Sequence, residues 1–235
     1  MSTHYGGKIY RSVSEITGPS GFYNVKTSQG TVVVYVNQSY DGGGWVLVLA
    51  NRLNTGGMNY LTYFDAIHHS NYRSGNARTT PRGLGLADFN SWIGVKYWQE
   101  LAGRASAGKV TVVQYVTGTN GTALEGSHTK RYRWRFDGFN STYGMTGATG
   151  ISDETSTGPP GFYSYHAANG FSLSTFDNDQ DAHGGNCSTF YDNNPWWYGA
   201  CWSGNYFGFG GGYVDGPYWD SSTTDYHQYG AVYIK

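Results

Sequence analysis

Charge is scarce in this sequence, and no apolar run approaches the length of a membrane span. Only 13% of the 235 residues are charged and the formal net charge is -1, so the chain has no basic field that would attract nucleic acid or an anionic membrane surface. A transmembrane helix needs roughly 20 consecutive apolar residues, whereas the mean hydropathy here is -0.51. We therefore expect neither nucleic-acid binding nor membrane insertion, and neutral ligands suit the chain better.

Cysteine is also rare, because Cys187 and Cys201 are the only two in the sequence. They form one bridge or remain two free thiols, and a zinc site is disfavoured because no second close Cys/His pair completes four ligands. A bridge closing a loop of about 15 residues would stabilise the fold by roughly 3 kcal/mol. It would also indicate an oxidising compartment.

The usual signatures of enzymes are missing. The sequence contains no GxSxG, no HExxH and no glycine-rich phosphate loop that opens a helix. Carboxylates are few, and Glu100 with Glu125 is the remaining candidate pair for a glycoside hydrolase. We expect no catalytic residues and favour a binding function.

Aromatic residues and glycine are abundant instead. The chain has 17% aromatic residues, with 22 Tyr, 8 Trp and 36 Gly. Tyr and Trp present a flat apolar face with a polar edge, which suits stacking on sugar rings, although such residues also fill protein cores. The glycines permit left-handed turns, so we expect much ordered loop.

The hydrophobic pattern predicts one large domain of α+β class, with a twisted antiparallel sheet and short helices. A lead-in over residues 1–15 precedes the domain at 16–235, and its loop-rich C-terminal subdomain covers about 171–235. Residues 52–82 have no clear period and are predicted as loop. Phe89, Ile93, Tyr97 and Leu101 share an i, i+4 spacing that predicts a short helix. Predicted strands cover 22–25, 31–36, 45–50, 109–116, 130–136 and 230–235.

Three aspartates alternate directly before the first cysteine, at Asp177, Asp179 and Asp181. Carboxylate oxygens on a glycine-rich loop suit Ca²⁺, which takes six to eight oxygen ligands. The loop is not an EF-hand, because Ala182 stands where the turn glycine belongs and Ser188 where the bidentate glutamate belongs. A solvated acidic turn is the alternative interpretation.

The order of several unusual blocks resembles fibrinogen-like domains, in particular the lectin branch that contains ficolins and tachylectins. In the C-terminal part the blocks are FSLSTFDNDQDAHGGNC, PWWYGAC, SGNYFG and YVDGPYW. In the first half they are SGFYNV, YVNQSYDGGGWVLVLANR and WIGVKYWQELA. The resemblance covers nearly the whole chain and implies the fibrinogen C-terminal fold.

The resemblance implies a calcium site in the aspartate-rich loop. Its ligands would be the side chains of Asp179 and Asp181, the backbone carbonyls of His183 and Gly185, and water. Asp177 would lie behind these ligands without binding the ion itself. A Cys187–Cys201 disulfide and a cis peptide between Ala200 and Cys201 belong to the same pattern.

The resemblance also implies a pocket beside this loop that takes an acetyl group. The residues that would form it are Cys201 and Trp202 through their amides, Tyr213 and Val214 as walls, and Tyr191, Phe209 and Tyr226 around them. The sequence departs from the family pattern at Trp202, where His is common, and at Val214, where a small Ala is common. Both changes add bulk and point toward another glycan stacked on Trp202. Val36 replaces a cysteine of the family's N-terminal disulfide, which favours a bacterial or phage-encoded member.

The expected function is therefore calcium-dependent binding of a cell-surface glycan or acetylated ligand, as an extracellular lectin-like adhesion module. The alternative is a fibre-tip or protein-binding adhesion module that uses the same pocket for a non-sugar ligand. Single sugar sites are weak, so we expect multivalent presentation by a homo-oligomer, with a trimer favoured, or by a fibre.

Overall fold

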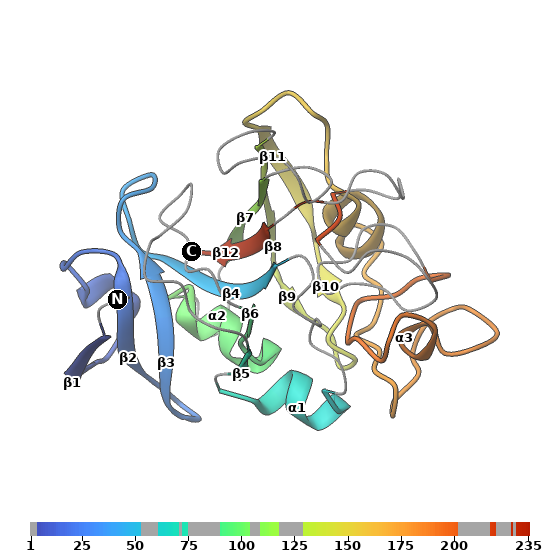
Figure 1. Ribbon diagram of the computed structural model, residues 1–235, viewed down its shortest axis with the longest axis horizontal. Helices are drawn as coiled ribbons and strands as arrows, with labels where there is room; N and C mark the ends of the chain where they lie inside the picture. Colours follow the sequence, from blue (N-terminus) through green and yellow to red (C-terminus); the bar gives the residue numbers. More distant parts are fainter. Residues whose placement is uncertain are drawn as a thin grey trace.

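A ten-stranded twisted sheet forms the centre of the protein (Figure 1), in the strand order β1-β2-β3-β4-β12-β7-β8-β11, with β6 paired to β4 and to β5. The computed structural model describes residues 4–52, 61–70, 72–74, 90–103, 109–117, 129–201, 217–219, 227 and 229–235. The strands are β1 (His4–Tyr10), β2 (Gly21–Thr27), β3 (Gly30–Asn37), β4 (Trp45–Arg52), β5 (Tyr72–Ser74), β6 (Asn90–Trp92), β7 (Val110–Thr117), β8 (Lys130–Phe136), β9 (Gly138–Phe139), β10 (Met145–Thr146), β11 (Thr149–Asp153) and β12 (Tyr229–Ile234). The helices are η1 (Val13–Glu15), α1 (Tyr63–His68), η2 (Val95–Tyr97), α2 (Trp98–Leu101), η3 (Phe162–Ala167) and α3 (Cys187–Phe190).

The six predicted strands are confirmed as β2, β3, β4, β7, β8 and β12. β2 and β3 form a hairpin that closes at Thr27 and Gly30, and β7 pairs antiparallel with β8 along its length. The β3–β4 connection turns on Gly42, Gly43 and Gly44, with φ values of 74°, 73° and 76°. A side chain at Gly43 would place its Cβ 2.2 Å from Gln38 Oε1, so this turn requires glycine.

The last strand lies in the middle of the sheet. β12 pairs antiparallel with β4 on one side and with β7 on the other, and all six of its residues are buried. Val232 and Ile234 contribute to one hydrophobic cluster, while Ala231 and Tyr233 contribute to the cluster on the opposite face. The sheet therefore has an apolar core on each side.

One strand pair departs from the predicted antiparallel sheet. Residues His4–Tyr10 form strand β1, which pairs parallel to β2 and continues the sheet at its edge. The short run KIY and the neighbouring glycines gave no alternation long enough to predict it. All other strand pairs among the described residues are antiparallel.

The predicted loop over 52–82 is wrong where helix α1 and strand β5 form. Thr62 caps the helix, because its Oγ1 accepts a hydrogen bond from Asp65 N at 3.1 Å and donates to the Asp65 carboxylate at 2.8 Å. This Thr-x-x-Asp pairing resembles a capping box, and the helix is too short to show a hydrophobic period.

The predicted helical face is confirmed only in its second half. Asn90–Trp92 pair with β4 and β5 as strand β6, so sheet hydrogen bonds override the i, i+4 pattern there, and Phe89 lies outside the described residues. The helical turns η2 and α2 begin at Val95. Between them and β6 stands Gly94, where an added Cβ would lie 2.3 Å from the Ile67 carbonyl oxygen of α1.

Tryptophan joins the C-terminal region to the sheet. Trp197 is buried and its ring lies 6.0 Å from Trp92, 5.8 Å from Trp98 and 5.3 Å from Phe162, measured between ring centroids. Its indole N–H donates to the Tyr143 carbonyl at 2.7 Å. Side chains from β6, α2, η3 and the loop-rich segment therefore share one core, which fixes the position of the candidate site.

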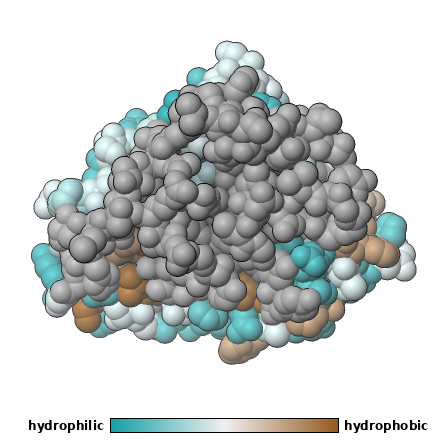
Figure 2. Space-filling model, viewed as in Figure 1, coloured by the Kyte–Doolittle hydropathy of each residue, from teal (hydrophilic) through white to brown (hydrophobic). Residues whose placement is uncertain are grey.

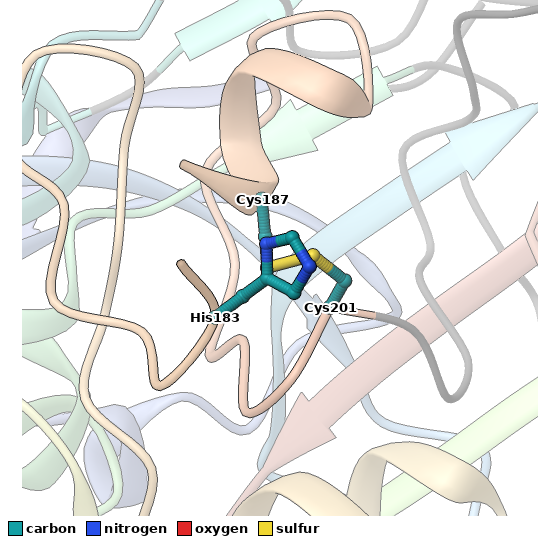
Figure 3. Close-up of side chains that lie close together, drawn as sticks. All are labelled: His183, Cys187 and Cys201. Carbon is teal, nitrogen blue, oxygen red and sulfur yellow. A yellow bond between two sulfur atoms is a disulfide. The ribbon is translucent and has the colours of Figure 1, made fainter. Parts of the chain in front are cut away.

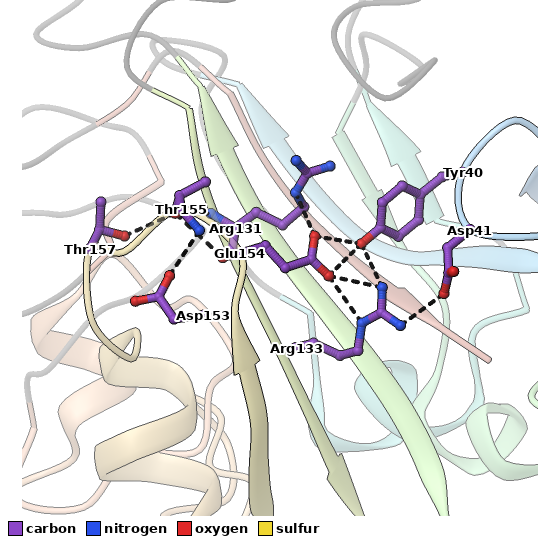
Figure 4. A network of polar contacts seen from close by, with 8 residues as sticks. All are labelled: Tyr40, Asp41, Arg131, Arg133, Asp153, Glu154, Thr155 and Thr157. Carbon is purple, nitrogen blue, oxygen red and sulfur yellow. Dashed lines mark hydrogen bonds and ion pairs between the residues drawn. The ribbon is translucent and has the colours of Figure 1, made fainter.

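A polar network ties the β3–β4 connection to strands β8 and β11 (Figure 4). Glu154 forms ion pairs at 2.8 Å with both Arg131 and Arg133, and it accepts a 2.7 Å hydrogen bond from Tyr40. Arg133 also pairs with Asp41 at 2.8 Å. Burial first, and then the Glu154 carboxylate, raise the pKa of Tyr40 to about 12, so Tyr40 remains a neutral donor at physiological pH.

We expect Glu154→Gln to lower the free energy of unfolding by about 2 kcal/mol, because two half-buried guanidinium groups lose their shared carboxylate. Urea unfolding measures the change. Lys109→Gln is the control, because the Lys109–Asp137 pair is about half exposed and such pairs contribute less than about 1 kcal/mol. Equal stability losses in the two variants would contradict the prediction.

Figure 2 shows small hydrophilic and hydrophobic areas side by side on the described part of the visible face. None of the helices among the described residues is long and apolar enough to cross a membrane.

Candidate functional site

The aspartate-rich loop is closed at its base by a backbone bridge. Ser174 N donates to Trp196 O at 2.9 Å and Trp196 N donates to Ser174 O at 3.0 Å. A tight turn follows at once, with Thr175 and Asn178 exchanging two backbone hydrogen bonds. These bonds hold both ends of the segment that carries the predicted metal ligands.

Asp181 organises the loop with its carboxylate. Oδ1 accepts a hydrogen bond from His183 N at 2.9 Å, and Oδ2 accepts one from Cys187 N at 2.8 Å. Asp179 Oδ1 accepts from Asp181 N at 3.2 Å. Burial raises the pKa of Asp181, and the negative charge of Asp179 raises it further, while the two backbone hydrogen bonds oppose the shift. A carboxylate whose negative charge is disfavoured by burial and by a neighbouring carboxylate suits a bound cation.

Asp177 is directed elsewhere. Its Oδ1 accepts hydrogen bonds from Tyr63 N at 2.9 Å and from Thr175 Oγ1 at 2.7 Å. This aspartate therefore fastens the start of α1 to the loop.

His183 and Gly185 form the exposed turn between Asp181 and the first cysteine. His183 Nδ1 lies 2.9 Å from the Gly185 carbonyl oxygen and 3.1 Å from Gly185 N. The imidazole ring also meets Phe190 edge to face, with the centroids 5.7 Å apart. The two carbonyls that are predicted to bind calcium thus belong to a turn that is ordered by the His183 side chain.

The predicted disulfide is present between Cys187 and Cys201, whose Cα atoms are 5.0 Å apart (Figure 3). His183 lies beside the bridge, and one of its ring nitrogens and the two sulfurs are within 4.8 Å of one another. The sulfurs are bonded to each other, so this group does not supply thiolate ligands to a metal ion.

The backbone at the second cysteine is left-handed. Cys201 has a φ of 75°, which is uncommon for a residue other than glycine. The prediction of a cis Ala200–Cys201 peptide is wrong for this structure, because no peptide bond among the described residues is cis. The turn direction comes from the left-handed Cys201 instead. Gly199 lies two residues before Cys201, and an added Cβ at Gly199 would lie 2.2 Å from the Phe171 ring.

Only two of the predicted ligand-pocket residues lie in the described part of the chain. Cys201 is nearly buried, and the half-buried Tyr191 ring stacks on Tyr198 with the centroids 5.8 Å apart. The other predicted pocket residues, Trp202, Phe209, Tyr213, Val214 and Tyr226, lie outside the described residues.

Asn186 was not predicted as a site residue, yet it connects the two halves of the loop. Its Nδ2 donates to the carbonyls of Thr175 and Phe176 at 3.0 and 3.3 Å, and its Oδ1 caps helix α3 by accepting from Thr189 N. Asparagine directly before a short helical turn is the signal that identifies such a cap.

Glu100, half of the candidate hydrolase pair, has a structural role. Its carboxylate accepts hydrogen bonds from Ser28 N at 2.5 Å and Ser28 Oγ at 2.9 Å, which ties α2 to the β2–β3 hairpin. Glu125 lies outside the described residues.

Comparison with known proteins gives the family. The model of the family described as fibrinogen beta and gamma chains, C-terminal globular domain, matches residues 11–223. Human angiopoietin-related protein 6 is 25% identical over 213 residues, and the fibrinogen alpha-2 chain of the lamprey Petromyzon marinus is 27% identical over 209 residues. Each alignment covers 85% of this chain but only 38% and 28% of the respective relative.

Solved structures agree in fold. The fibrinogen-like globe domain of human ANGPTL6 superposes with a TM-score of 0.65 at 21% identity, covering 100% of this chain and 98% of that one. Lamprey fibrin D-dimer, complexed with the peptide Gly-His-Arg-Pro-amide, gives a TM-score of 0.66 at 15% identity, covering 96% of this chain and 73% of that one. The family model covers most of the sequence, and the chain belongs to the family of fibrinogen C-terminal globular domains.

Proposed function

We propose that this domain is a non-enzymatic, extracellular recognition module that binds a cell-surface glycan or acetylated ligand in a calcium-dependent manner. The observation that carries the proposal is the Asp181 carboxylate, which accepts from both His183 N and Cys187 N and lies beside Asp179. The acidic side chain of Asp181 is thereby hydrogen-bonded to the backbone of Cys187, the first cysteine of the disulfide.

The residues present fit a calcium ion. Asp179 and Asp181 offer carboxylate oxygens, and the carbonyls of His183 and Gly185 belong to the same short turn. Bound calcium would neutralise the two carboxylates and would be coordinated by the carboxylate and carbonyl oxygens. In the protein, Asp181 would keep the backbone amides of His183 and Cys187 in place, and Asp177 would hold the loop against α1.

The ligand would bind beside the bridge. Successive residues in right-handed and left-handed conformations expose their backbone amides on one side of the chain, which suits an acetyl or other carbonyl oxygen. Cys201 has the left-handed conformation. We propose its amide and that of Trp202 as the donors, with Tyr191, Phe209, Tyr213, Val214 and Tyr226 as the surrounding walls.

A second candidate ligand is a peptide. The lamprey fibrin structure that shares this fold is a complex with the peptide Gly-His-Arg-Pro-amide, and the relatives reported above are angiopoietin-related and fibrinogen proteins. These matches support the fibrinogen family in general, and the lectin branch is our proposal. A protein-binding adhesion module would use the same bridged loop for a peptide.

The disulfide supports an extracellular location, because such bonds persist in oxidising compartments. Multivalent presentation, by a trimer of this domain or by a fibre, would compensate for a weak single site.

A glycan array probed with and without calcium, together with thermal unfolding, tests the proposal. We expect glycan binding in calcium, its loss in excess EDTA, and a lower melting temperature in EDTA. Binding that survives EDTA would contradict the role of calcium. An array without any bound glycan, combined with capture of Gly-His-Arg-Pro-amide, would replace the glycan with a peptide ligand.

We expect Trp202→Ala to weaken binding of the array's best glycan by about three- to tenfold, because stacking on an aromatic ring contributes on the order of 0.5–1.5 kcal/mol. The melting temperature should stay the same. Phe64→Ala is the matched control, since Phe64 is 67% exposed on α1. An unchanged dissociation constant for the Trp202 variant would place the ligand elsewhere.

A further inference from the structure

Four Asn-x-Ser/Thr tripeptides occur in the sequence, and they begin at Asn37, Asn120, Asn140 and Asn186. This tripeptide is the acceptor for N-linked glycans in secreted proteins. A glycan is bulky and hydrophilic, so a folded domain tolerates it only at the surface. Burial and side-chain hydrogen bonds therefore decide which tripeptide can carry a glycan in the folded protein.

Two of the tripeptides lie where a glycan would disrupt the fold. Asn37 is the last residue of β3 and is only 1% exposed. Asn186 Nδ2, the atom to which a glycan would be attached, donates to two backbone carbonyls at 3.0 and 3.3 Å, and these bonds join the two halves of the aspartate-rich loop. Asn120 lies outside the described residues.

Asn140 differs from both of them, because it is exposed in the turn that connects β9 to β10 (Figure 1). Its Oδ1 accepts hydrogen bonds from Thr142 N, Thr142 Oγ1 and Gly144 N at 2.9, 3.0 and 2.8 Å. In the part of the chain that the structure describes, Asn140 Nδ2 has no hydrogen-bond partner. An added Cβ at Gly144 would lie 2.9 Å from Nδ2, so the glycine keeps a side chain away from this atom.

We propose that Asn140 is an acceptor of an N-linked glycan when the chain is exported through a compartment that contains an oligosaccharyl transferase. The donor is a lipid-linked oligosaccharide diphosphate. A bond forms between Asn140 Nδ2 and C1 of the first sugar, the bond between C1 and the diphosphate oxygen breaks, and Nδ2 loses one proton. Because the three hydrogen bonds of the turn go to Oδ1, they survive the modification, and the folded turn accepts the glycan.

Secretion of the whole chain from cultured human cells, directed by an added signal peptide, tests the proposal through peptide mass spectrometry. We expect the peptide that contains Asn140 to carry a glycan in most molecules, and enzymatic release of the glycan to convert this asparagine to aspartate. The peptides that contain Asn37 and Asn186 should remain unmodified. Secreted, folded protein in which the Asn140 peptide is unmodified would overturn the proposal.

Variants within the tripeptide add a test of mechanism. Thr142→Ala keeps Asn140 but removes the hydroxyl that the tripeptide requires, so the intact protein should lose the mass of one glycan. Thr142→Ser restores a hydroxyl and should restore the modification. Ser141→Ala is the matched control, because the middle position accepts any residue except proline. A Thr142→Ala protein that keeps its glycan, or equal modification of Asn37 and Asn140, would also contradict the proposal.

Discussion

Replacing Asp181 with asparagine is expected to weaken calcium affinity by about 100-fold or more, and to abolish glycan binding with it. The variant loses a negative charge and one carboxylate oxygen from the proposed site. It also places an amide N–H₂ against one of the two backbone donors, His183 N or Cys187 N, that the carboxylate now satisfies. Isothermal titration calorimetry with calcium measures the first effect, and the glycan array measures the second.

Asp177→Asn is the matched control from the same loop. Asp177 Oδ1 accepts from Tyr63 N and Thr175 Oγ1, and an asparagine oxygen retains both interactions. Calcium affinity should therefore remain that of the unmodified protein. If the two substitutions weaken calcium binding equally, general loop charge explains the affinity, and the specific role of Asp181 is wrong.

The second large effect is expected from the double variant Cys187→Ser, Cys201→Ser. The bridge joins residues 14 positions apart, and a loop of about 15 residues is worth roughly 3 kcal/mol in the chain-entropy model. We expect a loss of that size in the free energy of unfolding, measured by urea denaturation. Calcium affinity should fall as well, because Asp181 accepts from the amide of residue 187.

Serine is close to cysteine in size and shape, so the packing change at the buried Cys187 is modest. Ser188→Ala serves as the control for a general perturbation of α3, since Ser188 is also buried and donates to the Asn194 carbonyl. A double variant that unfolds at the same urea concentration as the unmodified protein would contradict the prediction.

The sheet was largely predictable because its strands carry runs of β-branched and aromatic residues. The runs from Val32 to Val36 and from Val110 to Val116 are such segments, and both are strands. The position of β12 between β4 and β7 was not predictable from a pattern, because strand order depends on pairing between distant segments. Helix α1 was missed because a capped single turn has no hydrophobic period.

The candidate site was predictable in composition and less so in geometry. The spacing of Asp179, Asp181 and the cysteines indicated one bridged acidic loop, which the structure contains. Alternation alone did not show that Asp177 binds the start of α1, nor that Asn186 joins both halves of the loop. These roles depend on backbone groups of other segments, and a residue pattern carries no information about them.

The central place of β12 has a consequence for how the protein is made. During synthesis the edges of β4 and β7 wait for a partner strand that leaves the ribosome after every other described element. Until then both edges expose unpaired backbone groups to other nascent chains. The two edges are therefore the part of this sheet that most needs protection from other chains until β12 has been added.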